Sequence, residues 1–280
     1  WMLDEVDSLS VFPSRSTVVP ITPSVPATRS LCLLSCNILA GGNMSRYRDY
    51  ITRSMHQVLP GSRKRDNLDG LAKLMGEFDL VGLQEADAGS FRSGFLNQTQ
   101  YLAEAASFPF WSHQPNRRVS KLAASSNGLL ARNRPDEVVD YPLPSRIPGR
   151  GALWTRFGEG DDALIVVVAH LSLGAQARAR QMDFLAELVS DAPRTILMGD
   201  LNTTHDSPEL RRFHDKSGML APVAAPATFP SWSPRKAIDH ILVSPDIVVE
   251  KLWTLPHPVS DHLPIAASIQ IPISNRTPTD

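Results

Sequence analysis

Eight polar residues of catalytic types lie inside, directly after or directly before short apolar segments of this 280-residue sequence. Asp200 follows the apolar residues 196–198, and Asp239 lies between the apolar segments 237–238 and 241–243. An unpaired buried charge costs several kcal/mol, so each of these carboxylates requires a cation or a strong hydrogen-bond donor. The full set is Asn37, Glu85, His170, Asp200, Asn202, Asp239, Asp261 and His262.

The chemistry that these residue types favour is hydrolysis assisted by a hard divalent cation. Four carboxylates and two amides supply the oxygen ligands that Mg²⁺ prefers, with Mn²⁺ as the alternative ion. Histidines beside carboxylates can transfer protons or donate to a phosphoryl oxygen. The sequence therefore predicts a Mg²⁺-dependent hydrolase, provided that the fold brings these residues together.

The elements that must position these residues are predominantly short strands. Apolar residues at helical spacing predict helices over 67–78, 97–107 and 176–189. Strand alternation turns His240 away from the face that carries Asp239. We expect two packed mixed β-sheets with helices outside, in one domain. Strands are predicted over 31–39, 79–83, 128–131, 152–157, 163–170, 195–198, 238–243, 247–255 and 265–271.

Composition limits the classes of protein that this chain could be. Apolar residues make up 42% and charged residues 20%, with a net charge of −1, which argues against a wholly basic nucleic-acid coat protein or a polybasic membrane binder. The longest apolar run, 163–169, is far shorter than the roughly 20 residues of a membrane-spanning helix. We expect an extended Pro- and Ser-rich arm over 1–29, a catalytic domain over 30–273 and a polar tail over 274–280.

Cysteine usage and the start of the chain bear on its compartment. Cys32 and Cys36 lie four residues apart in one predicted strand, about 13 Å from each other, too far for a disulfide. We therefore expect two buried thiols and favour a cytoplasmic location. No signal peptide is apparent, although Trp1 precedes Met2, which leaves open whether a targeting segment comes before residue 1. We expect a monomer.

Six motifs in this order resemble those of the endonuclease/exonuclease/phosphatase superfamily, over roughly residues 31–271. The resemblance implies a DNase-I-like fold, a four-layered α/β sandwich, and cleavage of a phosphate ester by in-line water attack. The motifs are Asn37, Leu83-Gln84-Glu85, Ala169-His170-Leu171, Gly199-Asp200-Leu201-Asn202, Ile238-Asp239-His240-Ile241-Leu242 and Ser260-Asp261-His262-Leu263-Pro264.

The resemblance also implies a role for each residue. Glu85 resembles the principal metal ligand, with Asn37 beside it and Asp261 as a further carboxylate on the metal side. Asp200 and Asn202 resemble the pair that positions the attacking water and the phosphate. Asp239 with His262 resembles a carboxylate–histidine pair, and His170 resembles a general acid or phosphate donor. Arg150 and Arg178 also resemble family positions, near the cleft and at the start of the following helix, respectively.

Basic residues favour nucleic acid as the substrate. Three clusters, at 63–65, at Arg117 and Arg118 with Lys121, and at 235–236, lie in segments expected near the catalytic edge. They could focus a polyanion, and Trp111 or Trp232 could stack a base or touch lipid. A lipid-headgroup phosphodiesterase and a phosphomonoesterase remain alternatives. A binding module without catalysis is a remote one, because the polar set is complete.

Overall fold

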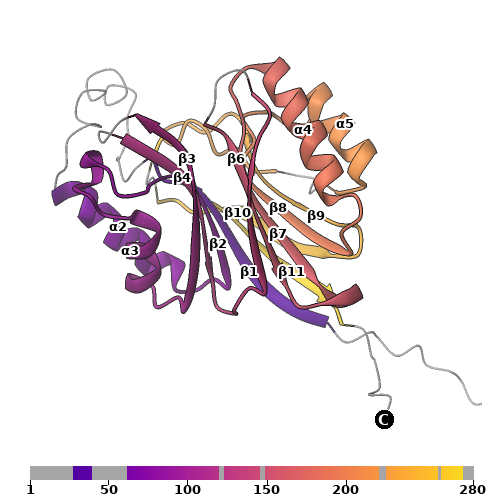
Figure 1. The fold of residues 1–280 in the computed structure, drawn as a ribbon, viewed down its shortest axis with the longest axis horizontal. Helices are drawn as coiled ribbons and strands as arrows, with labels where there is room; N and C mark the ends of the chain where they lie inside the picture. The colour runs from indigo at the N-terminus through magenta and orange to yellow at the C-terminus, as the bar shows by residue number, and fades with distance from the viewer. Residues whose placement is uncertain are drawn as a thin grey trace, which may run out of the picture.

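The structure is a computed structural model that describes residues 28–39, 62–119, 123–145, 149–220, 225–257 and 260–273. Within these residues two β-sheets pack face to face (Figure 1). The six-stranded sheet has the order β10 (Val248–Thr254), β11 (Ile265–Pro272), β1 (Thr28–Asn37), β2 (Leu80–Asp87), β4 (Ala123–Ala131) and β3 (Phe110–Val119). The five-stranded sheet has the order β5 (Glu137–Pro142), β6 (Gly151–Phe157), β7 (Leu164–His170), β8 (Arg194–Asp200) and β9 (Asp239–Val243).

Helices form the two outer layers, which confirms the predicted four-layered sandwich. Helices α2 (Ser62–Met75) and α3 (Gln98–Ala105) pack on the six-stranded sheet. Helices α4 (Ala175–Val189) and α5 (Pro208–Ser217) lie on the other side of the molecule (Figure 1). Two 3₁₀ turns, η3 (Phe91–Ser93) and η4 (Gly160–Asp162), complete the described elements. No described helix is long and apolar enough to cross a membrane.

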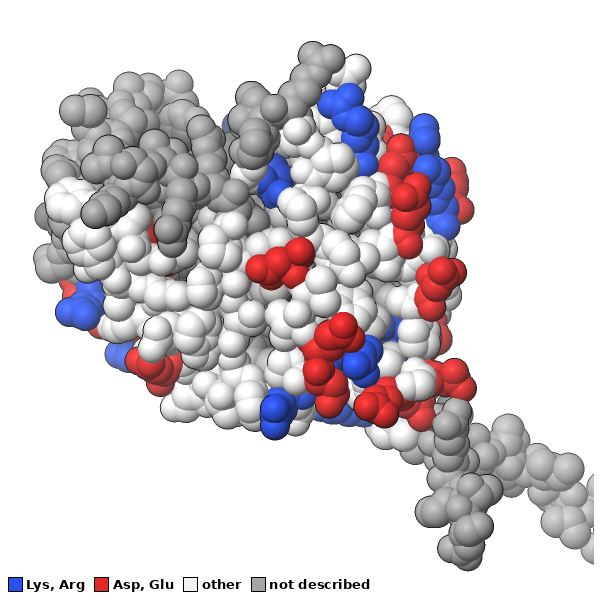
Figure 2. Space-filling model, in the orientation of Figure 1, with Lys and Arg blue, Asp and Glu red and all other residues white. Residues whose placement is uncertain are grey.

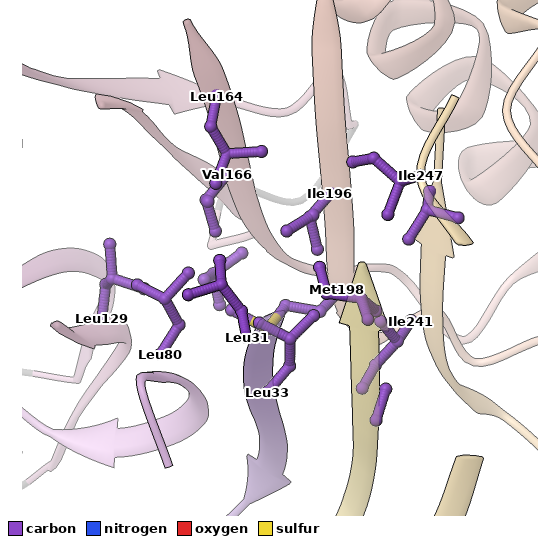
Figure 3. Close-up of a cluster of buried hydrophobic side chains, with 14 of the residues drawn as sticks. Leu31, Leu33, Leu80, Leu129, Leu164, Val166, Ile196, Met198, Ile241 and Ile247 are labelled. Atoms are coloured by element: carbon purple, nitrogen blue, oxygen red, sulfur yellow. The ribbon is translucent and has the colours of Figure 1, made fainter. Parts of the chain in front are cut away.

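Strand alternation divides the apolar side chains among three layers of core. In β1, Leu33 belongs to the cluster between the sheets, whereas Leu34 packs in the cluster beneath α2 and α3. The cluster between the sheets also contains Val166 of β7 and Met198 of β8 (Figure 3). Both sheets are thus buried on two faces, which explains the nearly continuous apolar runs in the sequence.

Two parallel strand pairs bring four of the polar residues to strand ends. In the six-stranded sheet, β1 pairs parallel to β2, and Asn37 lies beside Gln84, the neighbour of Glu85. In the five-stranded sheet, β7 pairs parallel to β8, and His170 lies beside Asp200. Carboxyl ends of parallel strands share one edge of a sheet, so each sheet presents two of these side chains at its edge.

The structure corrects several expectations. It contains two edge strands, β3 and β5, and helix α5, none of which the sequence predicted. Polar or proline residues interrupt alternation in both strands, and charged residues dominate α5. Cys36 is buried as expected, but Cys32 is only partly buried. Strand β1 begins at Thr28, inside the predicted arm, and both 1–27 and the predicted tail 274–280 lie outside the described residues.

Gly199, directly before Asp200, has no room for a side chain. Its φ is 150°, and a Cβ atom there would lie 1.9 Å from the carbonyl oxygen of Ala169. We predict that Gly199→Ala lowers the free energy of unfolding by at least about 3 kcal/mol, because left-handed strain and a backbone clash add. Urea denaturation measures this loss.

Gly160→Ala is the matched control for this prediction. Gly160 also has a positive φ, 61°, but nothing lies within 4 Å of the added methyl group. This control should therefore lose only about 1–2 kcal/mol, the cost of left-handed backbone strain. Equal losses in the two variants would show that the close approach of β7 and β8 is not a constraint.

Candidate active site

Side chains from both sheets meet at one largely buried cluster. Asn37 Nδ2 donates a 3.1 Å hydrogen bond to Asp200 Oδ2, which joins the end of β1 to the end of β8. His170 Nε2 lies 3.4 Å from the same Asp200 oxygen and 3.8 Å from Glu85 Oε1. The structure thus brings together residues up to 163 positions apart in the sequence.

A β-bulge orients Glu85. The register between β2 and β4 shifts between Leu83 and Ala86, so that Gln84 and Glu85 together oppose Asn127. Glu85 takes the left-handed conformation, with φ at 57°, which costs a non-glycine residue about 1–2 kcal/mol. Its side chain is 28% exposed and is therefore accessible to a ligand.

The charge of Glu85 is destabilised in this position. Burial raises the pKa of its carboxyl group, and nearby Asp261 raises it further, while Arg150, His262 and a hydrogen bond from Asn37 lower it. The net shift is upward, so the local cations do not fully offset the carboxylate.

Asp239 and His262 form a tight pair. His262 Nδ1 lies 2.8 Å from Asp239 Oδ2, and the other ring nitrogen lies 3.7 Å from Asp200 Oδ2. Burial disfavours the charged imidazole, but Asp239, Asp200 and Asp261 outweigh it and raise the pKa of His262 to about 10. His262 is therefore a cation at neutral pH. Thr228 donates a second hydrogen bond to Asp239 Oδ2.

Asp200 lies at the centre of the cluster. Burial, followed by the charge of Asp239, raises the pKa of its carboxyl group to about 7, against the lowering effect of His262. Its Oδ1 accepts a 3.0 Å hydrogen bond from the backbone of Asn202, and the Asn202 side chain donates to the carbonyl of Leu171, also at 3.0 Å. Asn202 has a φ of 51°, a conformation that asparagine tolerates better than most residues.

His170 differs from His262 in its charge. Burial lowers the pKa of His170 well below the usual value, and the positive charges of Arg150 and His262 lower it further. Arg150 Nη1 lies 2.6 Å from His170 Nε2. The two histidines therefore differ in protonation at neutral pH: His262 is charged, and His170 is neutral.

A buried amide bridge, which the sequence did not predict, supports Arg150. Asn127 Nδ2 donates to the carbonyl of Gly151 at 2.8 Å and to Gln114 Oε1 at 3.2 Å. Gln114 Nε2 in turn donates to the carbonyls of Tyr141 and Ala152. The bridge ties β3 and β4 to the other sheet beside Arg150. Its sequence signal is two amides in strand-forming segments, which is too common to stand out.

Arg178 and His240 both bond to backbone carbonyl groups. Arg178 forms a 2.8 Å ion pair with Glu209 and donates to the carbonyl of Ser172, so it holds the loop after His170. His240 Nε2 bonds to the carbonyl of Thr203 at 2.7 Å and not to the Asp239 partners, as strand alternation predicted.

The basic clusters are only partly described. The backbones of Arg117 and Arg118 belong to the edge strand β3, but their side chains, like those of Arg63 and Lys64, lie outside the described residues, as does Lys121 altogether. Arg235 and Lys236 are exposed. Trp111 is 38% exposed and stacks on His113, whereas Trp232 is partly buried.

The donor set fits a hard divalent cation. Burial raises the pKa of Glu85, Asp200 and Asp261. Among the described residues, the cations that act on these carboxyl groups are Arg150 and His262. Asp200, Asp239 and His262 place ligand atoms within 4.8 Å of one another, but Asp239 and His262 already bind each other. Glu85 is partly exposed and Asn37 lies beside it, and a carboxylate and an amide group can both offer oxygen to a hard cation.

The charge of His262 should depend on Asp239. We predict that Asp239→Asn lowers the pKa of His262 from about 10 toward its unfolded value of about 6.5, because burial then outweighs the remaining attraction. NMR titration of the His262 ring in chelator-treated protein measures this. In the unchanged protein this charge stabilises the fold fully below pH ~6.5, and the stabilisation is lost as the pH rises toward about 10; Asp239→Asn should flatten that loss.

Asp140→Asn is the control, because Asp140 acts on His113 instead. It should leave the His262 titration where it is. A His262 pKa that stays unchanged in Asp239→Asn would contradict the pairing described here.

Comparison with known proteins agrees with this fold. The Endonuclease/Exonuclease/phosphatase family model matches residues 34–262, and no curated protein sequence matches the chain. Similar solved structures include an endonuclease/exonuclease/phosphatase from Beutenbergia cavernae (18% identity, TM-score 0.70, 87% of this chain and 72% of that chain) and the mannosyl-6-phosphatase Bt3783 of Bacteroides thetaiotaomicron (20%, 0.62, 85% and 99%). Another is TDP2 of D. rerio with a single-strand DNA product (16% identity, TM-score 0.61, 86% of this chain and 98% of that chain). The chain therefore belongs to the endonuclease/exonuclease/phosphatase family of phosphoester hydrolases.

Proposed function

We propose that this protein is a Mg²⁺-dependent phosphodiesterase that cleaves nucleic acid by in-line attack of water. The observation that carries the proposal is the convergence of the Glu85 carboxyl, the charged His262 and the Arg150–His170 pair around Asp200. Acidic ligands for a cation thus lie beside positively charged donors for a phosphate. Hydrolysis of a phosphate ester needs both.

The metal ligands in this proposal are Glu85 and Asn37, with Asp261 on the same side. Mg²⁺ bound there would supply the positive charge that offsets a phosphate oxygen as charge develops on it. Asn37 has one amide oxygen, which already accepts from the backbone of Leu39 at 3.1 Å and keeps a second lone pair for a ligand.

Asp200 is the proposed proton acceptor for the attacking water. A carboxyl group with a pKa of about 7 is matched to that task near neutral pH. Asn202, whose backbone holds Asp200 Oδ1, would help to position the water and the phosphate.

The two histidines take different parts because their charges differ. His262, held as a cation by Asp239, would donate to a phosphoryl oxygen in the transition state. His170 is neutral, and together with Arg150 it would orient a second phosphoryl oxygen. Arg178 contributes indirectly by holding the loop after His170.

Several observations bear on the choice of substrate. The TDP2 structure carries a single-strand DNA product, and the arginines Arg117 and Arg118 lie on the edge strand β3. Figure 2 shows acidic and basic residues interspersed along the lower and right-hand margins of the face in view. No broad basic surface forms among the described residues along those margins.

A phosphomonoesterase is the second candidate. The neighbour Bt3783 is named a mannosyl-6-phosphatase and covers a similar share of this chain, 85% against 86% for TDP2. A lipid-headgroup phosphodiesterase is a further alternative. A screen of purified protein with Mg²⁺ or Mn²⁺ against single-stranded DNA, plasmid, RNA, phospholipids and sugar or inositol phosphates distinguishes these. Turnover of monoesters alone would overturn the nucleic-acid proposal.

Metal dependence is the first prediction of this proposal. Cleavage of bis(p-nitrophenyl) phosphate should vanish with EDTA and return with Mg²⁺ or Mn²⁺. Glu85→Gln should weaken Mn²⁺ binding at least about tenfold, because a neutral amide replaces a charged hard ligand. Calorimetric titration of Mn²⁺ measures the affinity without relying on turnover.

Glu159→Gln is the matched control, since Glu159 is an exposed carboxylate beside η4. Its Mn²⁺ affinity should equal that of the unchanged protein. Full activity after exhaustive chelation, or equal Mn²⁺ affinity in Glu85→Gln, would contradict the proposed metal site.

Salt dependence tests the polyanionic substrate. Each phosphate neutralised on duplex DNA contributes about 0.9 to the slope of log K against log salt, and about 0.7 on a single strand. Replacing Arg117 and Arg118 with Ala should weaken binding and lower the slope by roughly one unit for each phosphate that is no longer neutralised. Fluorescence anisotropy of a labelled oligonucleotide measures both quantities.

The double change Arg29→Ala and Arg134→Ala is the control. Both side chains are exposed and line a cavity at the start of β1 and after the end of β4, away from the catalytic strand ends. Their removal should leave the slope unchanged. If both double variants behave alike, the proposed binding of phosphate by Arg117 and Arg118 is wrong.

A further inference from the structure

A loop directly after the Glu85 strand presents two exposed aromatic rings. Phe91 is 40% exposed and Phe95 is 65% exposed, and their ring centroids lie 6.3 Å apart in an edge-to-face arrangement. Such a pair buries little apolar surface within the protein, so the fold gains little from it.

Buried hydrogen bonds hold this loop in one conformation. Asp87, at the end of β2, is fully buried and accepts bonds from the backbones of Gly89 and Ser90 and from the hydroxyl groups of Ser90 and Ser93. The Phe95 backbone donates to the carbonyl of Ser90 at 2.8 Å. The rings are therefore mounted on a pre-organised support.

Phe95 is also strained without a packing reason. Its φ is 64°, a conformation that is a genuine outlier for a bulky residue and is energetically unfavourable. The side chain remains mostly in solvent, so burial does not offset that cost. Strain at an exposed aromatic residue on a fixed loop points to a contact outside the chain.

The loop belongs to the catalytic edge. It leaves β2 two residues after Glu85 and returns through a bridge between Ala88 and Asn97. The backbone of Asp87 donates to Gln98 Oε1 at 2.8 Å, which pins the return. Phe91 and Phe95 therefore lie on a short loop that directly follows the strand end carrying Glu85.

We propose that Phe91 and Phe95 form a stacking platform for one unpaired base next to the scissile phosphate; this inference rests on the proposed nucleic-acid function. One ring of an edge-to-face pair keeps a face open, and every base has a π-face that can stack on it. The platform would select single-stranded or frayed ends over intact duplex, because paired bases are already stacked.

The surroundings favour a base over a lipid acyl chain. The neighbours of the two rings along the loop include Ser90, Ser93, Gly94 and Asn97, and the apolar Leu96 packs against the core beneath α2 and α3 instead of extending the exposed face. Membrane-docking surfaces combine a continuous apolar face with basic residues. Among the described residues of the loop after His170, Leu173 has an exposed apolar side chain. A single side chain does not make a continuous apolar face.

The experiment scans one abasic site along a single-stranded oligonucleotide. In the unchanged protein, KM should rise roughly tenfold at one position of the abasic site and little elsewhere, as expected for the loss of one stacked base. Phe95→Ala should raise KM by the same factor on the intact strand, with kcat nearly unchanged, and should remove the sensitivity at that position. A 2-aminopurine placed there should be quenched on binding, except in Phe95→Ala.

Three variants control this experiment. Phe95→Tyr should retain the low KM, Phe95→Leu should not, and Val248→Ala removes an exposed apolar side chain at the start of β10 without effect. The kcat for bis(p-nitrophenyl) phosphate should be the same in all variants, because stacking of its aromatic rings can change KM but not the cleavage step at Glu85. Equal losses on both substrates would mean that the loop merely supports Glu85, and would overturn the proposal.

Two further outcomes separate this proposal from the function on which it rests. If oligonucleotides are cleaved but Phe95→Ala leaves KM unchanged, the stacking platform is wrong and the nuclease proposal stands. If oligonucleotides are neither bound nor cleaved while bis(p-nitrophenyl) phosphate is, both fail. An effect of Phe95→Ala confined to phosphatidylcholine vesicles would overturn the base-stacking proposal in favour of lipid.

Discussion

Repulsion among four carboxyl groups at one buried edge is the constraint on which the rest of the site depends. Burial raises the pKa of Glu85, Asp200 and Asp261, while the charged His262 lies 2.8 Å from Asp239 and 3.7 Å from Asp200. Arg150 and His262 offset part of this negative charge. In the proposed function a divalent cation would offset the remainder, and a phosphate would bind to that cation and to the two positive side chains.

The sandwich holds these carboxyl groups in place against their mutual repulsion. The two sheets are joined at the site by buried polar links, Asn37 to Asp200 and Asn127 to Gly151, which fix the strand ends relative to each other. The positive φ of Glu85 stores strain that only a rigid surrounding structure maintains. The large apolar cluster between the sheets supplies that rigidity (Figure 3).

The parts of this account that the sequence could predict are those with strong local signals. Apolar runs ending in polar residues located the strands that carry Glu85, His170 and Asp200, and the ordered motifs predicted the family and the layered fold, both now confirmed. The sequence did not predict strands β3 and β5, because edge strands lack a continuous apolar pattern, as the polar sequence around Gln114 illustrates. The bulge at Glu85 and the opposite protonation of the two histidines depend on contacts between distant segments, which no local pattern records.

The central claim is that the partly exposed Glu85 and the adjacent Asn37 hold the cation, while Asp239 and His262 remain paired. Anomalous diffraction from crystals of the protein grown with Mn²⁺ tests this most directly. The account predicts one strong peak within coordination distance, about 2.0–2.3 Å, of a Glu85 oxygen, with the Asp239–His262 hydrogen bond intact. A peak bound instead by Asp200, Asp239 and His262, with that hydrogen bond broken, would contradict it.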